Sequence, residues 1–330
     1  MILLFLMQVV SPELIQNKRV LLRLDLDVPI KNGVIQEDSR LLAGMDTLGL
    51  CLEFATSVTI CGHLGRPGGK EVPELSVKPI VDWIEEGYGH IQLPEGKLHI
   101  LENLRFEPGE DGMDPVFAQE LASHGDVYVF EAFATHNPSV STTMIPALLP
   151  HAAGLRFAHE VEELLQVRDN PLKPLVVILG GAKVDTKMPV IKAMAGKADA
   201  VLVGGKLALE IKEQGITDLG PNVLVAKMSE DGFDISDETL AAWTNLMKTA
   251  KQIVWNGPVG KFEDPQYNQT EKIAQAIIDS GAKSIIGGGD TISAVTKYGL
   301  VEKFSFVSMG GGSMLKLLAD GTLSTIEALK

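Results

Sequence analysis

Several glycine clusters in this sequence stand beside a lysine or an acidic residue. The clusters are written GGAK, GGK, NGPVG, GGGD and GGGS, and each follows an apolar run. Because glycine has no Cβ, its backbone N–H groups can approach phosphate oxygens, and a following helix N-terminus adds favourable partial charge. None has the GxxxxGK[ST] pattern of a P-loop, and no GxGxxG follows the first predicted strand. The clusters predict a phosphate-binding site of another design.

Two lysines and an acidic pair extend these clusters. Lys183 and Lys187 follow GGA at a four-residue spacing, and Asp290 and Thr291 follow a triple glycine. Surface lysines are usually solvated, but an ammonium group beside a glycine turn can stabilise a transferring phosphoryl group. Asp290 suits Mg²⁺, which in nucleotide sites takes one or two carboxylates together with phosphates and water. Asp290 and Thr291 could equally cap the next helix, and the two roles are compatible.

The predicted strand ends in the first half of the chain carry charged residues. Arginine makes bidentate contacts with phosphate or carboxylate, and an aspartate can accept a hydrogen bond from a hydroxyl group. Each of these residues alone would more often be solvated, and a histidine there would more often be buried and hydrogen-bonded. Together they suit a small polyanion that also bears a hydroxyl group. The candidates are Asp25, Asp27, Arg40, His63, Arg66 and Arg105.

The elements that position these residues alternate along the whole chain. Short apolar runs such as RVLLRLDLDV, SVTICGH, DVYVFEAF, LKPLVVILGG and KSIIGGGD predict strands, and segments such as SRLLAGMDTLGLCLEFA predict helices. Near-continuous apolar strands between helices indicate parallel sheets covered on both faces. We therefore expect an α/β fold with two doubly wound, Rossmann-like parallel-sheet domains. The predicted domains are residues 1–157 and 172–330, joined by a hinge helix over 158–171.

Composition and charge also limit the possible functions. The chain has 330 residues, 45% of them hydrophobic, and a net charge of −14. Such an acidic protein is not expected to bind nucleic acid or anionic membranes generally, although a local basic cleft remains possible. The apolar start, MILLFLMQVV, is too short to span a bilayer and is expected to be a strand or an inward-facing arm. The cysteines, Cys51 and Cys61, are expected to be buried thiols of a cytoplasmic protein.

Longer motifs reveal a family resemblance. The chain resembles phosphoglycerate kinases over nearly its full length. The motifs that carry this resemblance occur in family order and include RVLLRLDLDVPI, GHLGRPGG, LENLRFEPGE, ILGGAKVDTK, VWNGPVGKFE, SIIGGGDT and SMGGGSMLKLL. The resemblance implies two Rossmann-like lobes with a hinge, and Mg²⁺-dependent phosphoryl transfer between 1,3-bisphosphoglycerate and ADP in glycolysis. It also implies a monomer that binds only small molecules.

The resemblance also assigns roles to residues. The catalytic set that it implies is Arg40, Lys183, Gly310, Gly311 and Gly312. The implied substrate-binding residues are Asp25, Asp27, Arg40, His63, Arg66, Arg105 and His136. The implied nucleotide-binding residues are Lys183, Lys187, Gly204, Gly205, Asn256, Gly257, Pro258, Glu263, Gly287, Gly288, Gly289, Asp290 and Thr291. Asp290 would contact the metal, and Glu263 would lie toward the ribose.

Some positions depart from the family pattern. Asp27 stands where the family usually has asparagine, and this extra carboxylate should weaken anion binding unless a cation offsets it. The loop EAFATHNPSVST stands where the family pattern is close to DAFGTAHRAHAS. Depending on the alignment, Pro138 or Asn137 replaces an arginine that grips the substrate, and a lost charged contact costs about 1.5–3 kcal/mol. His136, with the hydroxyls of Ser139 and Ser141, is the remaining candidate to replace it.

Two rival functions stay open on the sequence alone. One is a nucleotide-binding protein of the same fold that has lost kinase activity, which the missing arginine and Asp27 would explain. The other is a nicotinamide-dependent oxidoreductase on a similar sheet. The missing GxGxxG, and the missing acidic residue that normally follows it, argue against the oxidoreductase.

Overall fold

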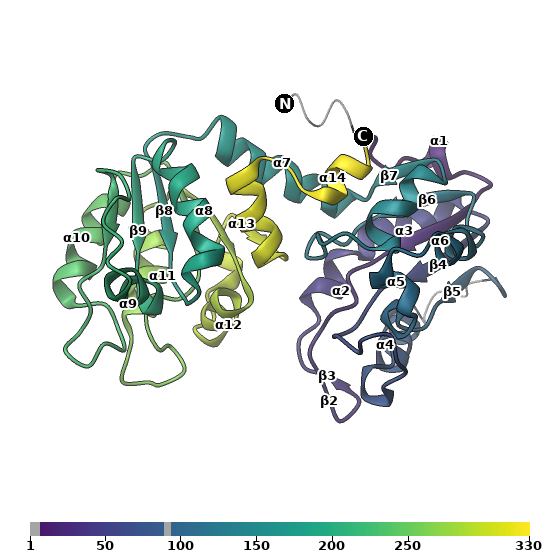
Figure 1. The fold of residues 1–330 in the computed structure, drawn as a ribbon, viewed down its shortest axis with the longest axis horizontal. Coiled ribbons are helices and arrows are strands. Elements are labelled where there is room, and N and C mark those ends of the chain that lie inside the picture. The colour runs from purple at the N-terminus through teal and green to yellow at the C-terminus, as the bar shows by residue number, and fades with distance from the viewer. Residues whose placement is uncertain (1–6, 89–93) are drawn as a thin grey trace. The chain divides into compact units, whose positions relative to one another are not determined.

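The computed structural model describes residues 7–88 and 94–330, which form two compact units. Unit 1 comprises residues up to Glu162 together with Thr322–Lys330, and unit 2 comprises Glu163–Gly321. Of the apolar start, residues 1–6 lie outside the described residues, while Val9 pairs in parallel with Ala153. The prediction of an α/β class with two parallel-sheet domains is confirmed (Figure 1).

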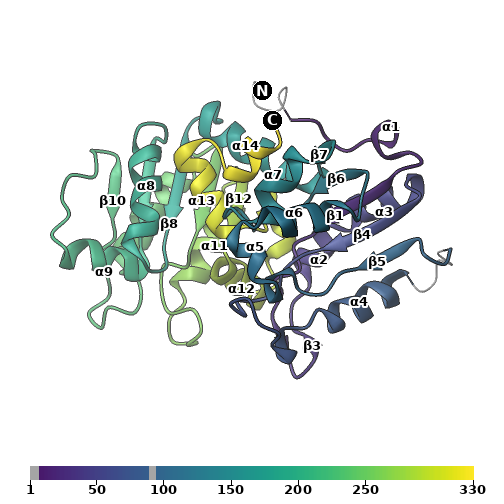
Figure 2. The same cartoon turned by 45° about the vertical axis from the view of Figure 1, so that its right-hand side comes forward.

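Unit 1 is built on a parallel sheet with the strand order β5-β4-β1-β6-β7 (Figure 2). Its strands are β1 (Arg19–Arg23), β4 (Ser57–Cys61), β5 (Leu98–Ile100), β6 (Val127–Phe130) and β7 (His151–Ala153), and a small antiparallel pair is formed by β2 (Ile30–Lys31) and β3 (Val34–Ile35). Arg23 pairs in register with Cys61 and with Phe130. The segments that follow β1, β4 and β6 therefore leave the sheet at one edge.

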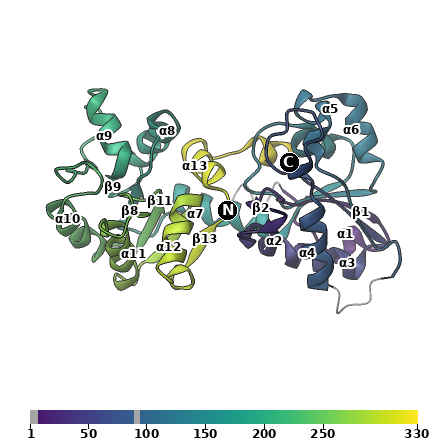
Figure 3. The same cartoon turned by 90° about the horizontal axis from the view of Figure 1, so that it is seen from below.

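Helices cover both faces of this sheet. Figure 3 shows α5 and α6 on one side of β1, and α1, α3 and α4 on the other. The sequence predicts a single helix through residues 39–55, but Gly44 divides it, and a Cβ there would lie 2.8 Å from Leu24. The helices of unit 1 are α1 (Pro12–Ile15), α2 (Ser39–Ala43), α3 (Met45–Phe54), η1 (Pro73–Leu75), α4 (Lys78–Tyr88), η2 (Leu104–Phe106), α5 (Pro108–Gly112), α6 (Pro115–Ala122), η3 (Val140–Met144), η4 (Ile145–Ala147) and α14 (Ser324–Ala328).

Unit 2 is built on a second parallel sheet, with the order β10-β9-β8-β11-β12-β13. Its strands are β8 (Leu175–Leu179), β9 (Ala200–Val203), β10 (Val223–Val225), β11 (Gln252–Asn256), β12 (Lys283–Gly287) and β13 (Phe306–Ser308). The last residues of neighbouring strands are in register: Leu179 with Val203 and Asn256, Asn256 with Gly287, and Gly287 with Ser308. All the glycine clusters named above therefore begin at one edge of one sheet.

The helices of unit 2 also lie on both faces. Figure 3 shows α8 and α9 on one side of the strands, and α10, α11 and α12 on the other. The strand residues between them are almost all buried and apolar, which is typical of a doubly wound sheet. The helices are α8 (Val184–Ala195), α9 (Gly205–Glu213), α10 (Asp237–Met247), α11 (Gln269–Asp279), α12 (Gly289–Lys297), η5 (Val301–Lys303) and α13 (Gly311–Asp320).

The helix between the units is α7 (Leu155–Asp169), and it overlaps the hinge predicted over 158–171. The two units divide within it, after Glu162. The sequence assigns the end of the chain to the second domain, whereas Thr322–Lys330 packs with unit 1, where Ser324 Oγ donates to the His136 carbonyl at 2.5 Å. Across the described ranges, no helix is long and apolar enough to cross a membrane.

The first turn of α7 is held by a buried carboxyl group. Glu131, directly after β6, accepts hydrogen bonds from the backbone N–H of Phe157 at 2.5 Å and of Arg156 at 3.3 Å, and from the Thr47 hydroxyl. Burial raises the pKa of Glu131 from its ordinary 4.5 to about 8, although these donors oppose the shift. The carboxyl group of Glu131 is therefore easier to protonate in the folded protein than in the unfolded chain.

We predict that this group makes the protein less stable as the pH rises. Because the folded-state pKa is raised, the contribution of Glu131 is fully present below pH 4.5 and is lost by about pH 8. Urea unfolding measured across this range should show a stability slope that Glu131→Gln reduces by up to about 1.4 kcal/mol per pH unit. An identical slope in the parent and the variant would contradict the assignment.

Candidate active site

The glycine clusters of unit 2 bring strand-end backbones into direct contact. A Cβ on Gly180 would lie 2.1 Å from the Pro258 carbonyl oxygen, and one on Gly311 would lie 2.6 Å from Gly288 Cα. Gly288 also has a φ of +97°, in the region that favours glycine. The turn of Gly287, Gly288 and Gly289 thus meets the turn of Gly310, Gly311 and Gly312, at the N-termini of α12 and α13.

Lys187 lies at the ends of β8 and β11 and is only 6% exposed. Its ammonium group donates to the carbonyl oxygen of Gly180, and to the carbonyl and Oδ1 of Asn256 at 3.0 and 3.1 Å. Burial lowers the pKa of Lys187 to about 8, and the charge of Asp290 opposes this shift. The ammonium group of Lys187 joins the ends of β8 and β11, and it therefore fixes the geometry of the turns that follow these two strands.

Other predicted residues hold the neighbouring turn. Thr291 is fully buried, and its hydroxyl oxygen accepts from the Gly257 N–H at 2.6 Å. The Pro258 carbonyl accepts from the Gly181 N–H at 2.7 Å. Gly205, with a φ of +63°, begins α9 after Gly204. These residues position the backbone of the site through groups that already have partners.

A cavity of about 470 Å³ lies above these turns. Within it, Asp290 is exposed in the first turn of α12, and Glu263 is exposed beyond the turn that follows β11. Lys183 is the N-cap residue of α8 and is exposed. Its φ of +75° is uncommon for a residue with a side chain. The lining residues are Gly181, Ala182, Gly205, Lys206, Leu209, Gly232, Phe233, Pro258, Gly260, Lys261, Phe262, Glu263 and Asp290.

The side chains at this cavity would bind a metal ion only together with a phosphate ligand. Over the described residues, no three His, Cys, Asp or Glu side chains are grouped so that they could hold a metal ion together. Asp290 supplies one carboxylate at the N-terminus of α12, beside the glycine turns. Because Mg²⁺ bound with nucleotides needs only one or two protein carboxylates, this arrangement fits a Mg²⁺–nucleotide complex and not a free metal site.

In unit 1, an unpartnered carboxylate marks the end of β1. Asp25 is 7% exposed, and its two carboxylate oxygens have no hydrogen-bond partner of ordinary geometry among the described side chains and backbone. Burial raises the pKa of Asp25, while Arg40 and Arg23 oppose the shift. A buried acceptor without a donor is costly, so a ligand hydroxyl would complete this site.

The extra carboxylate of Asp27 does have compensating partners. Asp27 Oδ1 accepts from the Gly65 N–H at 2.9 Å, and Oδ2 lies 3.8 Å from the Arg40 guanidinium. Arg40 also donates to the Asp27 carbonyl at 2.6 Å. Arg40 is therefore the cation that offsets the carboxylate of Asp27, and part of its charge is used for that purpose.

His63 is buried and neutral. It follows β4, and its Nδ1 lies 2.7 Å from the guanidinium of Arg23, which can only donate. Burial lowers the pKa of His63 to about 2, and the charges of Arg23, Arg105, Arg40 and Arg66 act in the same direction. Nδ1 is thus the acceptor, and Nε2 carries the proton that a ligand oxygen can accept.

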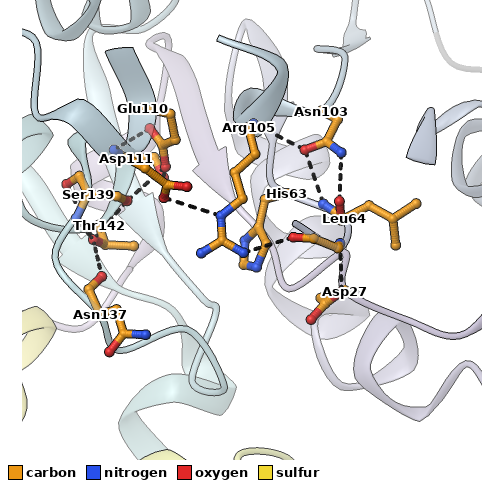
Figure 4. Close-up of polar contacts among 12 residues, drawn as sticks. Asp27, His63, Leu64, Asn103, Arg105, Glu110, Asp111, Asn137, Ser139 and Thr142 are labelled. Carbon is orange, nitrogen blue, oxygen red and sulfur yellow. Dashed lines mark hydrogen bonds and ion pairs between the residues drawn. The ribbon is translucent and has the colours of Figure 1, made fainter. Parts of the chain in front are cut away.

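Arg105 and Arg66 complete the basic group, and Figure 4 shows Arg105. Arg105 donates to the Gly65 carbonyl at 2.9 Å and pairs with Asp111 at 3.3 Å, and its side chain is 16% exposed. Arg66, in the loop after β4, is exposed. The structure therefore brings Asp25, Asp27, Arg40, His63 and Arg105 to one edge of the sheet, around the loops that follow β1 and β4.

The loop EAFATHNPSVST folds inward after β6, and its serines bind a carboxylate. Ser139 Oγ donates to Glu110 Oε1 at 2.7 Å (Figure 4), and Ser141 Oγ donates to the same oxygen at 2.5 Å. Both serines are buried, whereas Asn137 and Pro138 are exposed and His136 is half-buried. The hypothesis that these hydroxyls replace the missing arginine is therefore wrong, because Glu110 already occupies them. Only His136 stays a candidate.

Sequence reasoning missed two charged residues that organise this region. Arg23 is fully buried, and its Nε donates to Ser141 Oγ at 3.0 Å, while Glu110 is 1% exposed. A charged residue at the end of an otherwise apolar strand, as in RVLLR, was an available signal for Arg23. Glu110 lies in a polar segment and gave no such signal.

Comparison with known proteins identifies the family. The sequence profile of the phosphoglycerate kinase family matches residues 12–230 and 215–321. The chain belongs to the phosphoglycerate kinase family. The solved phosphoglycerate kinase from Coxiella burnetii has a TM-score of 0.85 and 32% sequence identity, with 98% of each chain covered. The one from Pyrococcus horikoshii has a TM-score of 0.82 and 26% identity, with 96% of each chain covered.

Membership of the phosphoglycerate kinase family confirms the resemblance predicted from the motifs. It supports a kinase that transfers phosphoryl groups, a place in glycolysis and small-molecule substrates. Both solved relatives are matched over nearly all of this chain, so the likeness extends through both units.

We predict that Ser141→Ala destabilises the protein by about 1–3 kcal/mol, because it removes one hydrogen bond from the buried Arg23 and one from the buried Glu110. Chemical denaturation at pH 7 would measure this loss. Thr143→Ala is the matched control, since it removes a neighbouring hydroxyl that donates only to the Ser139 carbonyl, and it should cost less than about 1 kcal/mol. Equal effects of the two substitutions would contradict the charge-linking role of Ser141.

Proposed function

We propose that this protein is an active phosphoglycerate kinase. It would transfer a phosphoryl group reversibly between 1,3-bisphosphoglycerate and ADP, with Mg²⁺, giving 3-phosphoglycerate and ATP. The observation that carries the proposal is the contact of the two triple-glycine turns, Gly311 against Gly288, beside a cavity that Asp290 lines. Backbone turns of this kind, at helix N-termini, suit the phosphates of a nucleotide.

On the substrate side, the basic group of unit 1 would hold the glycerate. Arg40, Arg66 and Arg105 would bind its phosphate and carboxylate, and His63 would donate from Nε2. Asp25, whose carboxylate oxygens have no hydrogen-bond partner of ordinary geometry in the part of the chain that the structure describes, would accept from its hydroxyl group. His136 would contribute from the loop after β6.

On the nucleotide side, Mg²⁺ bound to Asp290 and the phosphates would neutralise charge on the phosphate chain. Lys187 and Asn256 would keep the turns in place, and Glu263 would bind the ribose. Lys183 and Arg40 would stabilise the phosphoryl group as it moves from the acyl phosphate oxygen to the terminal oxygen of ADP. No covalent nucleophile is needed, so positioning and electrostatics supply the catalysis. A monomeric state and a cytoplasmic location stay predictions.

A second candidate is a nucleotide-binding member of the same fold without kinase activity. It is favoured by the exposed Pro138 and by the use of Ser139 and Ser141 to bind Glu110. Calorimetry with Mg-ADP and with 3-phosphoglycerate separates the two candidates. Binding of nucleotide without any binding of 3-phosphoglycerate would favour the second.

We predict that a coupled assay will detect ATP formation from 1,3-bisphosphoglycerate and ADP, and that Lys183→Met will lower kcat about 10²–10³-fold. Lys192→Met is the matched control, because Lys192 is exposed on the same helix, α8, and should leave the rate unchanged. No turnover by the parent protein at millimolar substrate would reject the proposed activity.

We also predict that Pro138→Arg restores a substrate contact. It should lower the KM for 3-phosphoglycerate about tenfold, with a smaller effect on kcat, since the lost interaction belongs to substrate binding. The reverse reaction with ATP and 3-phosphoglycerate would measure both constants. An unchanged KM would show that the loop after β6 does not need an arginine to bind the substrate.

A further inference from the structure

The loop between β8 and α8 holds Lys183 in an unfavourable backbone conformation. Lys183 has a φ of +75° and a ψ of 84°, in the left-handed region that residues with a Cβ rarely adopt. Such a conformation persists only where the surrounding structure holds it in place. The proposed function gives Lys183 the task of stabilising the transferring phosphoryl group. Whatever holds this conformation therefore also fixes the point from which the Lys183 side chain extends.

The residues that lead into α8 offer no cap for its N-terminus. A typical N-cap residue is Ser, Thr, Asp or Asn, whose side-chain oxygen accepts from an N–H of the first turn. Lysine can only donate, and Lys183 makes no side-chain capping bond. The preceding residues, Gly180, Gly181 and Ala182, have no side-chain acceptor either. The first N–H group of α8 therefore depends on an acceptor from another element.

Glu210 of α9 supplies this acceptor. Its Oε2 accepts from the backbone N–H of Val184 at 3.1 Å, and Val184 is the residue directly after Lys183. Glu210 is half-buried and Val184 is buried, so water competes little for this bond. A carboxylate is also favoured at this place by the positive end of the helix dipole.

This hydrogen bond acts directly on the backbone of Lys183. The N–H of Val184 belongs to the peptide group that joins it to Lys183, so holding this N–H restrains the ψ angle of Lys183. The carbonyl of the same peptide group accepts from the N–H and the hydroxyl of Thr186, at 3.3 and 3.0 Å. Both sides of the peptide group are thus held, one by α8 itself and one by Glu210.

The helix that carries Glu210 is fixed against the same loop. Figure 3 shows α8 and α9 on one side of the sheet. The Leu207 N–H, in the first turn of α9, donates to the Gly181 carbonyl at 2.7 Å, and a Cβ on Gly205 would lie 3.3 Å from the Gly181 nitrogen. Glu210 follows Leu207 by three residues, which places it on a neighbouring part of the same helix face. The start of α9 therefore delivers the carboxylate to the start of α8.

We propose that Glu210 is a positioning residue for phosphoryl transfer. Its carboxylate holds the peptide group after Lys183, and so keeps the Lys183 ammonium group where the transferring phosphoryl group needs it. This inference rests on the proposed function for the role of Lys183, and it adds to the reaction a residue from a different helix.

A kinetic double-mutant cycle on the full chain tests the inference. Glu210→Ala should lower kcat for ATP formation about tenfold and change each KM less than about twofold, because Glu210 acts through Lys183 and not on a substrate. In a Lys183→Met background, the same substitution should lower kcat by no more than about twofold, since the group that it positions is gone. Glu213→Ala, which removes an exposed carboxylate from the end of α9, is the matched control and should leave kcat unchanged.

Two conservative variants separate the hydrogen bond from the charge. Glu210→Gln keeps an acceptor oxygen at the same reach, and it should retain kcat within about threefold of the parent protein. Glu210→Asp keeps the charge but is one methylene shorter, so it should lose about as much kcat as Glu210→Ala. The opposite order, with Asp active and Gln impaired, overturns the inference in favour of a purely electrostatic role.

Amide hydrogen exchange at Val184 gives a readout that does not depend on turnover. This amide should exchange about tenfold faster in Glu210→Ala and Glu210→Asp than in the parent protein. Unchanged exchange, or an equal loss of kcat with and without Lys183, overturns the inference and leaves the kinase proposal standing. A parent protein without turnover overturns the proposed function, and the catalytic role of Glu210 with it, even where the exchange result shows that Glu210 holds Val184.

Discussion

The structure of unit 2 depends on one constraint, which is the in-register arrangement of parallel strand ends. Leu179, Asn256, Gly287 and Ser308 finish their strands at one level, so the backbones that continue from them must share a narrow space. Only glycine at positions such as 180 and 311 lets these backbones touch. The carbonyl groups forced together at this edge would repel one another, and the buried ammonium group of Lys187 binds three of the oxygen atoms there.

In unit 1 the constraint is a different one, because a charged side chain is buried at the end of an apolar strand. Arg23 is inside the sheet, and its charge is shared with Ser141, the Leu24 carbonyl and His63. Through Ser141 it is linked to Glu110, so one buried cation and one buried anion balance across a serine. Arg40, Arg66 and Arg105, unlike Arg23, keep part of their side chains exposed to solvent.

The sequence predicted the fold class, the strands that carry the glycine clusters and the family, because periodicity and glycine turns are local signals. It also led to the residues that the structure gathers at each sheet edge. It could not predict that Gly44 would divide a helix, since the close approach of Leu24, in the segment after β1, is a tertiary contact. Nor could it predict that Ser139 and Ser141 would bind Glu110, because their partner lies about 30 residues away in a segment with no pattern of its own.

The place of the last residues has a consequence for how the protein is made. Residues 322–330 pack with unit 1, and Ser324 holds the carbonyl of His136 in the loop after β6. During translation, all of unit 2 is synthesised between the two parts of unit 1. Unit 2 is continuous in sequence and can complete its core first, whereas unit 1 must wait on the ribosome for its closing helix, α14. The loop that bears His136 can therefore gain its contact with Ser324 only after unit 2 has been synthesised.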